Sequence, residues 1–448
     1  MSASPRALFW HRRDLRLEDN TGLSAALMQV GDVLPVFIFD RHILDPLPDR
    51  DDPRITFLHQ EVSAMQAQLR AWGSDLRVYY GLPEEVFAQA KAEFPALECV
   101  YTNRDYEVYA KRRDAEVQRR LEAQGVGFKT CKDQVVFEEK EVLTLQGKPF
   151  GVYTPYSRAW RKQFHPDMLD EQAVERHRAG FWQTEARYPI RTIEEMGFVA
   201  RPDFRFPSRE IRLEVLRAYG DRRDLPALDG TSRLSLHLRF GTVSIRKAYK
   251  CALEHSDKWM AELIWREFYM QLLANNPRIE QQAFRPEYDN LRWRNPEVEF
   301  AAWCEGRTGY PLVDAGMRQL AQEHWMHNRV RMVVASFLCK HLLIDWRLGD
   351  QFFARKLLDY DLASNNGGWQ WAAGSGADAA PYFRVFNPAL QAQKFDPQMA
   401  YIKRYVPEYN DPRYLQHPIV DHAFARARAL EEYGRAVKLP AADSGYGE

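Results

Sequence analysis

The sequence predicts an α/β domain followed by an all-α domain, because the pattern of apolar residues changes along the 448 residues. In residues 1–130, short apolar runs alternate with helical patterns, which is typical of a doubly wound parallel sheet. Residues 131–204 lose this periodicity and gather proline, arginine and aromatic residues, which predicts a connector. Residues 205–448 repeat apolar residues every three or four positions, which predicts a helical domain.

The individual elements follow from the same patterns. A helix that stops at a glycine is expected at residues 54–73. The proline-free stretch 314–346 is expected to be helical, and the clusters RTGYP and NNGG beside it to be turns. Strands are expected at residues 7–11, 33–40, 76–81 and 98–102.

Composition excludes several classes of protein. The 62 Lys and Arg residues balance the 62 Asp and Glu residues, so binding to nucleic acid must come from a local patch. The five cysteines form no CxxC pair, which argues against a zinc site or a disulfide framework, and we expect no metal. No apolar run suits a signal peptide or a membrane span, so we expect a cytoplasmic protein that does not enter membranes.

Two amides, two glycines and two tryptophans stand together in NNGGWQW, residues 365–371. Glycine has no Cβ, so a pair of glycines lets the backbone approach a flat or bulky partner. The indoles beside them suggest that this partner is aromatic, in a chain with 12 Trp and 25 Phe.

Two glycine-containing stretches invite a phosphate-binding interpretation. In GTSRLSLHLRFG, residues 230–241, hydroxyl groups and an arginine precede a helical pattern and suit a phosphate, although a simple helix cap is the more ordinary reading. GSGADA, residues 374–379, matches GxGxxA but follows no strand, so its glycines are assigned to a turn.

Two predicted helices each have a face on which apolar and polar residues are mixed. Trp325, Asn328, Arg329 and Met332 fall at helical spacing, which fits either a cavity wall or a core edge. Glu262 lies one turn from Trp265; a dry cavity would raise the pKa of Glu262, whereas in solvent it would be an ordinary surface carboxylate. Basic residues interleaved with aromatic ones fit either a surface that binds along a phosphate backbone or a charged face that keeps the protein soluble. These basic residues are Arg329, Arg331, Arg347, Arg355, Lys356, Arg384, Lys394, Lys403 and Arg404.

Taken together, these stretches resemble the photolyase/cryptochrome flavoprotein family over nearly the whole chain. The motifs that carry the resemblance are LFWHRRDLRLEDNTGL, GTSRLS, LIWREFY, TGYPLVDAGMRQL, WMHNRVRM, IDWRLGDQFF and DYDLASNNGGWQWAAGSGADAAPYFRVFNP. The chain is most similar to class I photolyases that repair cyclobutane pyrimidine dimers, because WMHNRVRM has Asn328 and Met332 where (6-4) enzymes carry a histidine-bearing pattern. The resemblance implies light-driven electron transfer from fully reduced FAD to a dimer flipped out of UV-damaged DNA.

The resemblance also implies roles for individual residues. Thr231, Ser232, Arg233, Leu234 and Ser235 match the segment that binds the FAD phosphates. Asn365 matches the residue that faces flavin N5, and the other cofactor contacts match Tyr219, Arg331, Asp359 and Asp361. Glu262, Trp265, Asn328, Met332 and Trp371 match the lesion pocket, in which two indoles cradle the dimer. Arg223, Arg329 and Arg384 match phosphate contacts to the damaged strand, and Trp293, Trp346 and Trp369 match the tryptophan chain that reduces photoexcited oxidised flavin.

The antenna chromophore is where the sequence departs from folate-binding relatives. Those relatives carry an Asn-Glu pair after YEV, whereas this chain has Tyr109 and Ala110, and no lysine lies between Pro277 and Trp293. A deazaflavin, a second flavin or no antenna stay open as alternatives.

A sensor and a binding protein are the rival functions. A blue-light-sensing cryptochrome would bind the same flavin without repair, but such sensors often carry long C-terminal extensions and this sequence runs only 37 residues beyond residue 411. An architectural DNA binder would leave Asn365 and the tryptophan chain unexplained. We therefore expect a monomeric repair enzyme.

Overall fold

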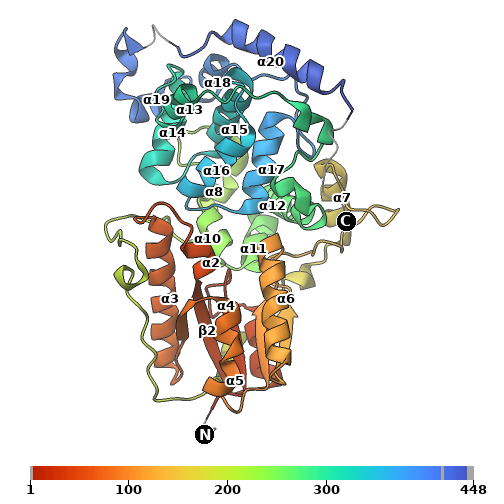
Figure 1. Cartoon of the computed structure of the whole chain (residues 1–448), viewed down its shortest axis with the longest axis vertical. Helices are drawn as coiled ribbons and strands as arrows, with labels where there is room; N and C mark the ends of the chain where they lie inside the picture. The colour runs from red at the N-terminus through yellow and green to blue at the C-terminus, as the bar shows by residue number, and fades with distance from the viewer. Residues whose placement is uncertain (1–3, 415–417, 441–448) are drawn as a thin grey trace. The chain divides into compact units, whose positions relative to one another are not determined.

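The N-terminal strands form one parallel sheet in the order β3-β2-β1-β4-β5, in a computed structural model that describes residues 4–414 and 418–440 (Figure 1). β1 lies between β2 and β4 and runs parallel to both. This confirms the doubly wound parallel sheet. The strands are β1 (Ala7–His11), β2 (Val33–Asp40), β3 (Arg77–Gly81), β4 (Cys99–Asn103) and β5 (Gly127–Cys131).

Both faces of the sheet are buried, which is why its strands are nearly continuous apolar runs. Along β1, Ala7 and Phe9 belong to one apolar core, while Leu8 and Trp10 belong to another on the opposite face. The helices packed with this sheet are α1 (Thr21–Gln29), α2 (Arg41–Leu44), α3 (Pro53–Ala71), α4 (Pro83–Ala88), α5 (Ala90–Glu93) and α6 (Val108–Glu122).

The four strands expected from the sequence are found with ends shifted by at most one residue, and β5 is an additional strand. β5 pairs only with β4, at the edge of the sheet. Its sequence GFKTC alternates exposed and half-buried residues and has no apolar run that would predict a strand.

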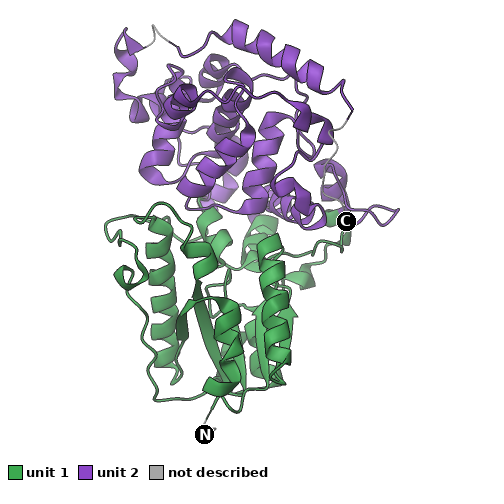
Figure 2. Cartoon of the chain, in the orientation of Figure 1, with its two compact units in different colours: residues 1–142, 160–211, 233–254 green, residues 143–159, 212–232, 255–448 purple. Residues whose placement is uncertain are grey.

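The chain divides into two compact units that interleave along the sequence (Figure 2). Unit 1 comprises residues 1–142, 160–211 and 233–254, and unit 2 comprises residues 143–159, 212–232 and 255–448. The expected connector is more than a surface segment, because Val174, Phe181, Ile193, Met196 and Phe198 lie in a core of unit 1. Helices α10 (Ser235–Phe240) and α11 (Ile245–His255) return the chain to unit 1.

Unit 2 is helical and its largest core is rich in aromatic residues, among them Trp303, Trp346 and Trp369. Helix α7 (Tyr153–Gln163) begins in this unit. The further helices are α8 (Leu213–Arg217), α9 (Tyr219–Arg222), α12 (Asp257–Asn275), α13 (Glu297–Cys304), α14 (Pro311–Glu323), α15 (Asn328–Ser336), the π-helix Phe337–His341, α16 (Trp346–Lys356), α17 (Leu362–Ala373), α18 (Pro388–Phe395), α19 (Ala400–Tyr405) and α20 (His422–Ala436).

The stretch 314–346 is not one helix. α14 ends at Glu323, and His324 has a left-handed φ of 50°. His327 then caps α15 by accepting the N–H of Arg329 on its side chain. Trp325 therefore lies outside α15, and the expected face that joins it to Asn328 and Met332 does not exist.

The NNGG cluster is also not a turn, because residues 365–368 lie inside α17. Asp361 caps this helix by accepting the N–H of Ser364, and Asn366, Trp369 and Gln370 are buried. Packing of these side chains offsets the cost of about 1 kcal/mol that each glycine brings to a helix interior. The turn that the sequence assigned to GSGADA is present, with Gly374 at a φ of 90°.

None of the helices within residues 4–414 and 418–440 combines the length and the apolar character that crossing a bilayer requires.

Candidate functional site

Asn365 on α17 is held by an acidic partner from α16. Its Nδ2 donates to Oδ1 of Asp350 at 2.6 Å and to the Asp350 carbonyl oxygen at 3.2 Å. Burial raises the pKa of Asp350 to about 7, although the hydrogen bond from Asn365 acts in the opposite direction. The amide oxygen of Asn365 accepts no hydrogen bond from the described residues and remains an acceptor for another N–H.

Arg331 and Asp359 form the expected ion pair, with Nη2 to carboxylate distances of 2.8 and 3.1 Å. Arg331 is fixed further by the Met326 carbonyl oxygen, which accepts from its Nε at 2.8 Å. Asp361, two residues along, is buried and caps α17. The three side chains therefore have fixed positions, and their contact with a cofactor stays a prediction.

The segment from Thr231 to Ser235 leads into α10. Leu234 takes the N-cap position of this helix, and its apolar side chain forms no capping hydrogen bond. Arg233 has a φ of 52°, in the left-handed region where non-glycine residues are uncommon. Thr231 accepts a hydrogen bond from Arg212 on its carbonyl oxygen at 3.2 Å. The assignment of this segment to the FAD phosphates stays a prediction.

Tyr219, another expected cofactor contact, begins α9. Its ring lies beneath the Arg223 guanidinium at 5.7 Å, and burial raises the pKa of its hydroxyl.

Glu262 on α12 does not face a dry cavity. Its carboxylate pairs with the Arg223 guanidinium, and about a third of the side chain is exposed (33%). The structure thus joins a predicted pocket residue to a predicted phosphate contact. Of the two environments left open by the sequence, the partly exposed one is found.

Trp265 lies on α12 one turn after Glu262, and a tyrosine ring stacks parallel to one face of its indole. The rings of Tyr153 and Trp265 are 3.7 Å apart with an interplanar angle of 7°. No sequence pattern marked Tyr153, because it stands at the start of α7, more than 100 residues from α12.

Helix α15 begins at Asn328, which is exposed. Met332, one turn further along this helix, is half-buried. Arg329 is held between Asp224, at 2.8 Å from its Nη2, and the ring of Phe395, at 4.4 Å. Trp371 is half-buried on α17.

Three of the nine residues of the expected basic cluster have carboxylate partners. Arg329, Arg331 and Arg347 are all paired with carboxylates. Arg384 is exposed and has no carboxylate partner among the described residues.

The three tryptophans of the expected chain belong to one core and differ in exposure. Trp369 and Trp346 are buried, and Trp293 is half-buried at its edge. Gly349 on α16 permits close packing against Trp369, since a Cβ there would lie 2.2 Å from the indole. Burial thus decreases from Trp369 and Trp346 to Trp293.

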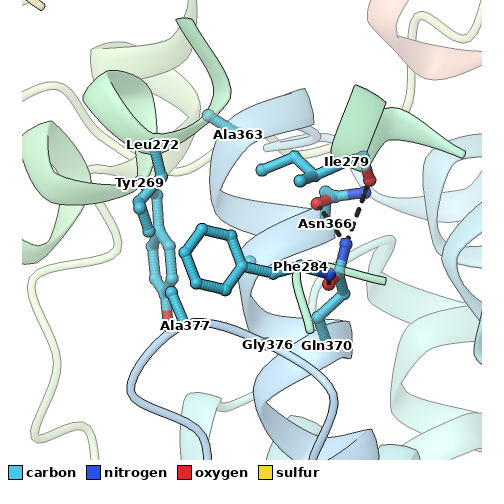
Figure 3. A pocket seen from close by; sticks show the side chains of 10 residues that line it. Tyr269, Leu272, Ile279, Phe284, Ala363, Asn366, Gln370, Gly376 and Ala377 are labelled. Carbon is cyan, nitrogen blue, oxygen red and sulfur yellow. Dashed lines mark hydrogen bonds between the residues drawn. The ribbon is translucent and has the colours of Figure 1, made fainter. Parts of the chain in front are cut away.

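Beside α17 lies a pocket with room for about one water molecule. Tyr269 of α12 and Phe284 form one side, and Asn366 and Gln370 form the other, with hydrogen bonds from both amides to the Ile279 carbonyl oxygen (Figure 3). Gly367 packs on Tyr269 so closely that a Cβ would lie 2.1 Å from the ring. This close approach, and not an exposed loop, explains the first glycine of NNGG.

Comparison with known proteins gives consistent matches. Residues 7–175 match the family described as DNA photolyase, and residues 259–414 match the FAD binding domain of DNA photolyase. A deoxyribodipyrimidine photo-lyase of Halobacterium salinarum is 39% identical, with 96% of this chain and 99% of that protein covered.

Solved structures agree with these matches. A class III photolyase from Agrobacterium tumefaciens superimposes with a TM-score of 0.86 at 32% identity, over 98% of this chain and 99% of the other. An archaeal photolyase from Sulfolobus tokodaii, which holds two FAD molecules, gives a TM-score of 0.79 at 34% identity, over 96% and 99%.

Proposed function

The chain belongs to the DNA photolyase family, and we propose that it repairs cyclobutane pyrimidine dimers in DNA by light-driven electron transfer. The observation that carries this proposal is the 39% identity to a deoxyribodipyrimidine photo-lyase over nearly the full length of both chains. A non-repairing cryptochrome is less favoured, because Glu262, Trp265 and Trp371 are all retained. A DNA-binding protein without a flavin does not explain the match to an FAD-binding domain.

The described residues fit FAD. Asn365 offers an amide oxygen whose direction is fixed by the Nδ2 bonds to Asp350, and this oxygen can accept from the N5–H of a reduced flavin. Arg331 and Asp359 supply a rigid pair of charges on the same unit. Thr231 to Ser235, which lead into the N-terminus of α10, are proposed to hold the phosphates. When bound and fully reduced, FAD supplies the electron that light transfers to the dimer.

The protein residues bind and orient the DNA. Trp265 and Trp371 are proposed to stack on the flipped-out dimer, and Arg384 to bind a phosphate beside it. Glu262, after taking up a proton from solvent, is proposed to donate a hydrogen bond to a base carbonyl; the neutral carboxyl no longer pairs with Arg223, whose guanidinium can then bind the strand. A fixed donor at this carbonyl would stabilise the negative charge that the dimer acquires.

A second chromophore is consistent with the two FAD molecules of the Sulfolobus tokodaii relative, and its identity in this chain stays open. That the protein is monomeric and cytoplasmic remains a prediction.

The first test is a repair assay. The purified protein would be reduced without oxygen, mixed with an oligonucleotide that contains one cyclobutane thymine dimer, and illuminated with blue light. We expect the absorbance of the normal thymine band to recover, and this recovery should require both light and flavin. A flavin that photoreduces without recovery of the band would contradict dimer repair, and the same assay with a (6-4) lesion would then separate a second repair activity from a sensor.

Replacement of Glu262 tests its proposed role. Glu262→Ala should lower the repair yield per absorbed photon by about tenfold, because one charged hydrogen bond is worth roughly 1–2 kcal/mol. Glu262→Gln keeps a donor of similar size and should lose less. Both variants should retain FAD, as measured by the flavin absorbance per protein; an unchanged yield in Glu262→Ala would count against this role.

A further inference from the structure

The stack of Tyr153 on Trp265 is the closest parallel ring pair of unit 2 among the described residues, at 3.7 Å and 7°. Phe268 packs edge-on against both rings, at 5.8 Å from Tyr153 and 5.5 Å from Trp265. An indole has two faces, and this stack covers one of them. A base that stacks on Trp265 would therefore have to approach the opposite face, and the ring of Tyr269 lies against the indole at 5.4 Å with a tilt of 36°.

Tyr153 is anchored at both its side chain and its backbone. Its hydroxyl donates to the Ala261 carbonyl oxygen at 2.8 Å, one turn before Trp265 on α12. Its backbone N–H donates to the carboxylate of Asp378. The ring therefore lies in one plane along α12, and it fixes the plane of the indole beneath it.

Asp378 belongs to GSGADA, the glycine-containing stretch that the sequence analysis assigned to a turn. This stretch follows Trp371, at the end of α17, and turns at Gly374 with a φ of 90°. Gly376 packs against the end of α17, since a Cβ there would lie 2.9 Å from the Gln370 carbonyl carbon. The chain thus runs from Trp371 through a tight turn to Asp378, whose carboxylate holds the residue stacked on Trp265.

We propose that Tyr153 is a positioning residue of the lesion pocket, which together with Asp378 holds Trp265 in the orientation that stacks on the dimer. This inference rests on the proposed function, because it requires Trp265 to contact the lesion. A half-exposed indole on a helix loses side-chain freedom when a base stacks on it, and a fixed tyrosine removes that freedom before binding. When the dimer is bound, Trp265 lies between Tyr153 and the lesion.

The experiment compares binding of the FAD-loaded protein to two duplexes that differ by a single cyclobutane thymine dimer. Fluorescence anisotropy gives the ratio of the two dissociation constants, which reports lesion recognition separately from general DNA affinity. Tyr153→Ala should lower this ratio by about two- to tenfold, the range of one aromatic stack. Tyr153→Phe keeps the ring and its backbone anchor but loses the hydroxyl bond to Ala261, so its ratio should fall less than that of Tyr153→Ala.

Variants at Asp378 provide an independent measurement if Tyr153→Ala does not fold. The backbone of Asp378 is left-handed, with a φ of 50°, and both asparagine and glycine tolerate this conformation. Asp378→Asn keeps an oxygen that accepts from Tyr153 and should bind as the wild type does. Asp378→Gly removes the acceptor and should show part of the loss seen in Tyr153→Ala.

Three results would overturn the inference. A Tyr153→Ala variant with an unchanged ratio would mean that the stack has no role in recognition. A raised ratio would mean that the tyrosine covers the face that the lesion needs. Equal losses in Tyr153→Phe and Tyr153→Ala would assign the effect to the hydroxyl group. Trp265→Ala separates this proposal from the proposed function, because no loss of lesion preference in that variant would mean that Trp265 does not contact the dimer at all.

Discussion

The carboxyl group of Asp350 is buried beside Asn365, and burial raises its pKa to about 7 from an ordinary value of 3.8. Between about pH 4 and pH 7, the unfolded chain loses a proton that the folded chain keeps. The free energy of unfolding therefore falls as the pH rises through this window, and it stays low above it. Near neutral pH, Asp350 is poised to change charge next to the residue expected to face the flavin.

Asp350→Asn removes this titration. In the FAD-loaded protein, the stability of the variant relative to the wild type should rise by about 2–3 kcal/mol between pH 5 and pH 8, because only the wild type must keep a buried carboxylate at high pH. Denaturant unfolding at several pH values measures this difference. Asp167→Asn, at an exposed position, is the matched control. A difference that does not change with pH would contradict the burial of a titrating group at residue 350.

At the residue scale, the sequence predicted pairs that belong to recognisable motifs. The pair between Arg331 and Asp359 was expected from the resemblance and is present. Asp350 and Tyr153 were missed because each acts through a neighbour distant in sequence: Asp350 through Asn365, and Tyr153 through Trp265. Neither residue stands in a pattern with a chemical meaning of its own.

Helix α17 shows how packing overrides local preference at the scale of an element. Its two adjacent glycines predict a turn, but Asp361 caps the helix and buried residues follow on one side. The glycines also differ from each other. A Cβ on Gly367 would lie 2.1 Å from Tyr269, whereas a Cβ on Gly368 would meet no heavy atom within 4 Å.

Alanine at these two positions should have opposite effects. Gly367→Ala forces α17 away from Tyr269 and should destabilise the protein by about 1–3 kcal/mol. Gly368→Ala meets open space and should stabilise the helix by roughly 0.5–1 kcal/mol through backbone entropy. Urea unfolding of both variants measures the effects, and each variant serves as the control for the other. Equal stability of the two variants would contradict the described packing of Gly367.

The sequence predicted elements well where they bury apolar residues. It predicted them poorly where polar residues determine the ends of an element. β1 and β2 were predicted with their exact ends because both of their faces are buried. β5 was missed because an edge strand needs few apolar residues. The break between α14 and α15 was missed because it depends on the backbone of His324 and on the cap by His327, which apolar periodicity does not report.

At the scale of the whole molecule, the three tryptophans link a buried core to its edge. Trp293→Phe should slow the photoreduction of oxidised flavin, because it removes the half-buried end of the chain. Repair by protein that has already been reduced chemically should be spared. Flavin absorbance under blue light and the thymine-band assay measure the two activities, and Trp72→Phe, in unit 1, is a control. Equal loss of both activities would rule out the role of Trp293 as a relay.

The family could be predicted from the sequence because its motifs are long and occur in order, whereas the interleaving of the units could not. The domain boundaries predicted at residues 130 and 204 divide the chain into successive segments. In the structure, the chain passes between the two units five times. The crossings depend on contacts between distant residues. Arg246, for example, donates to Asp19 at 2.8 Å and to Asp133 at 2.9 Å, with all three side chains buried.

This interleaving predicts how the chain can be divided. A fragment of residues 1–142 contains all five strands of the described residues but lacks Phe181 and Phe198 from its core. It also leaves Asp19 without its partner Arg246, whereas Asp133 keeps its pair with Arg16. Loss of one partner from a buried ion pair alone costs about 3–5 kcal/mol, which is a large part of the stability of a small domain. We therefore expect residues 1–142 not to unfold cooperatively, and residues 1–254, which restore both missing segments, to do so. Thermal unfolding followed by circular dichroism compares the two fragments; a cooperative transition in the shorter one would show that the sheet does not depend on the returning segments.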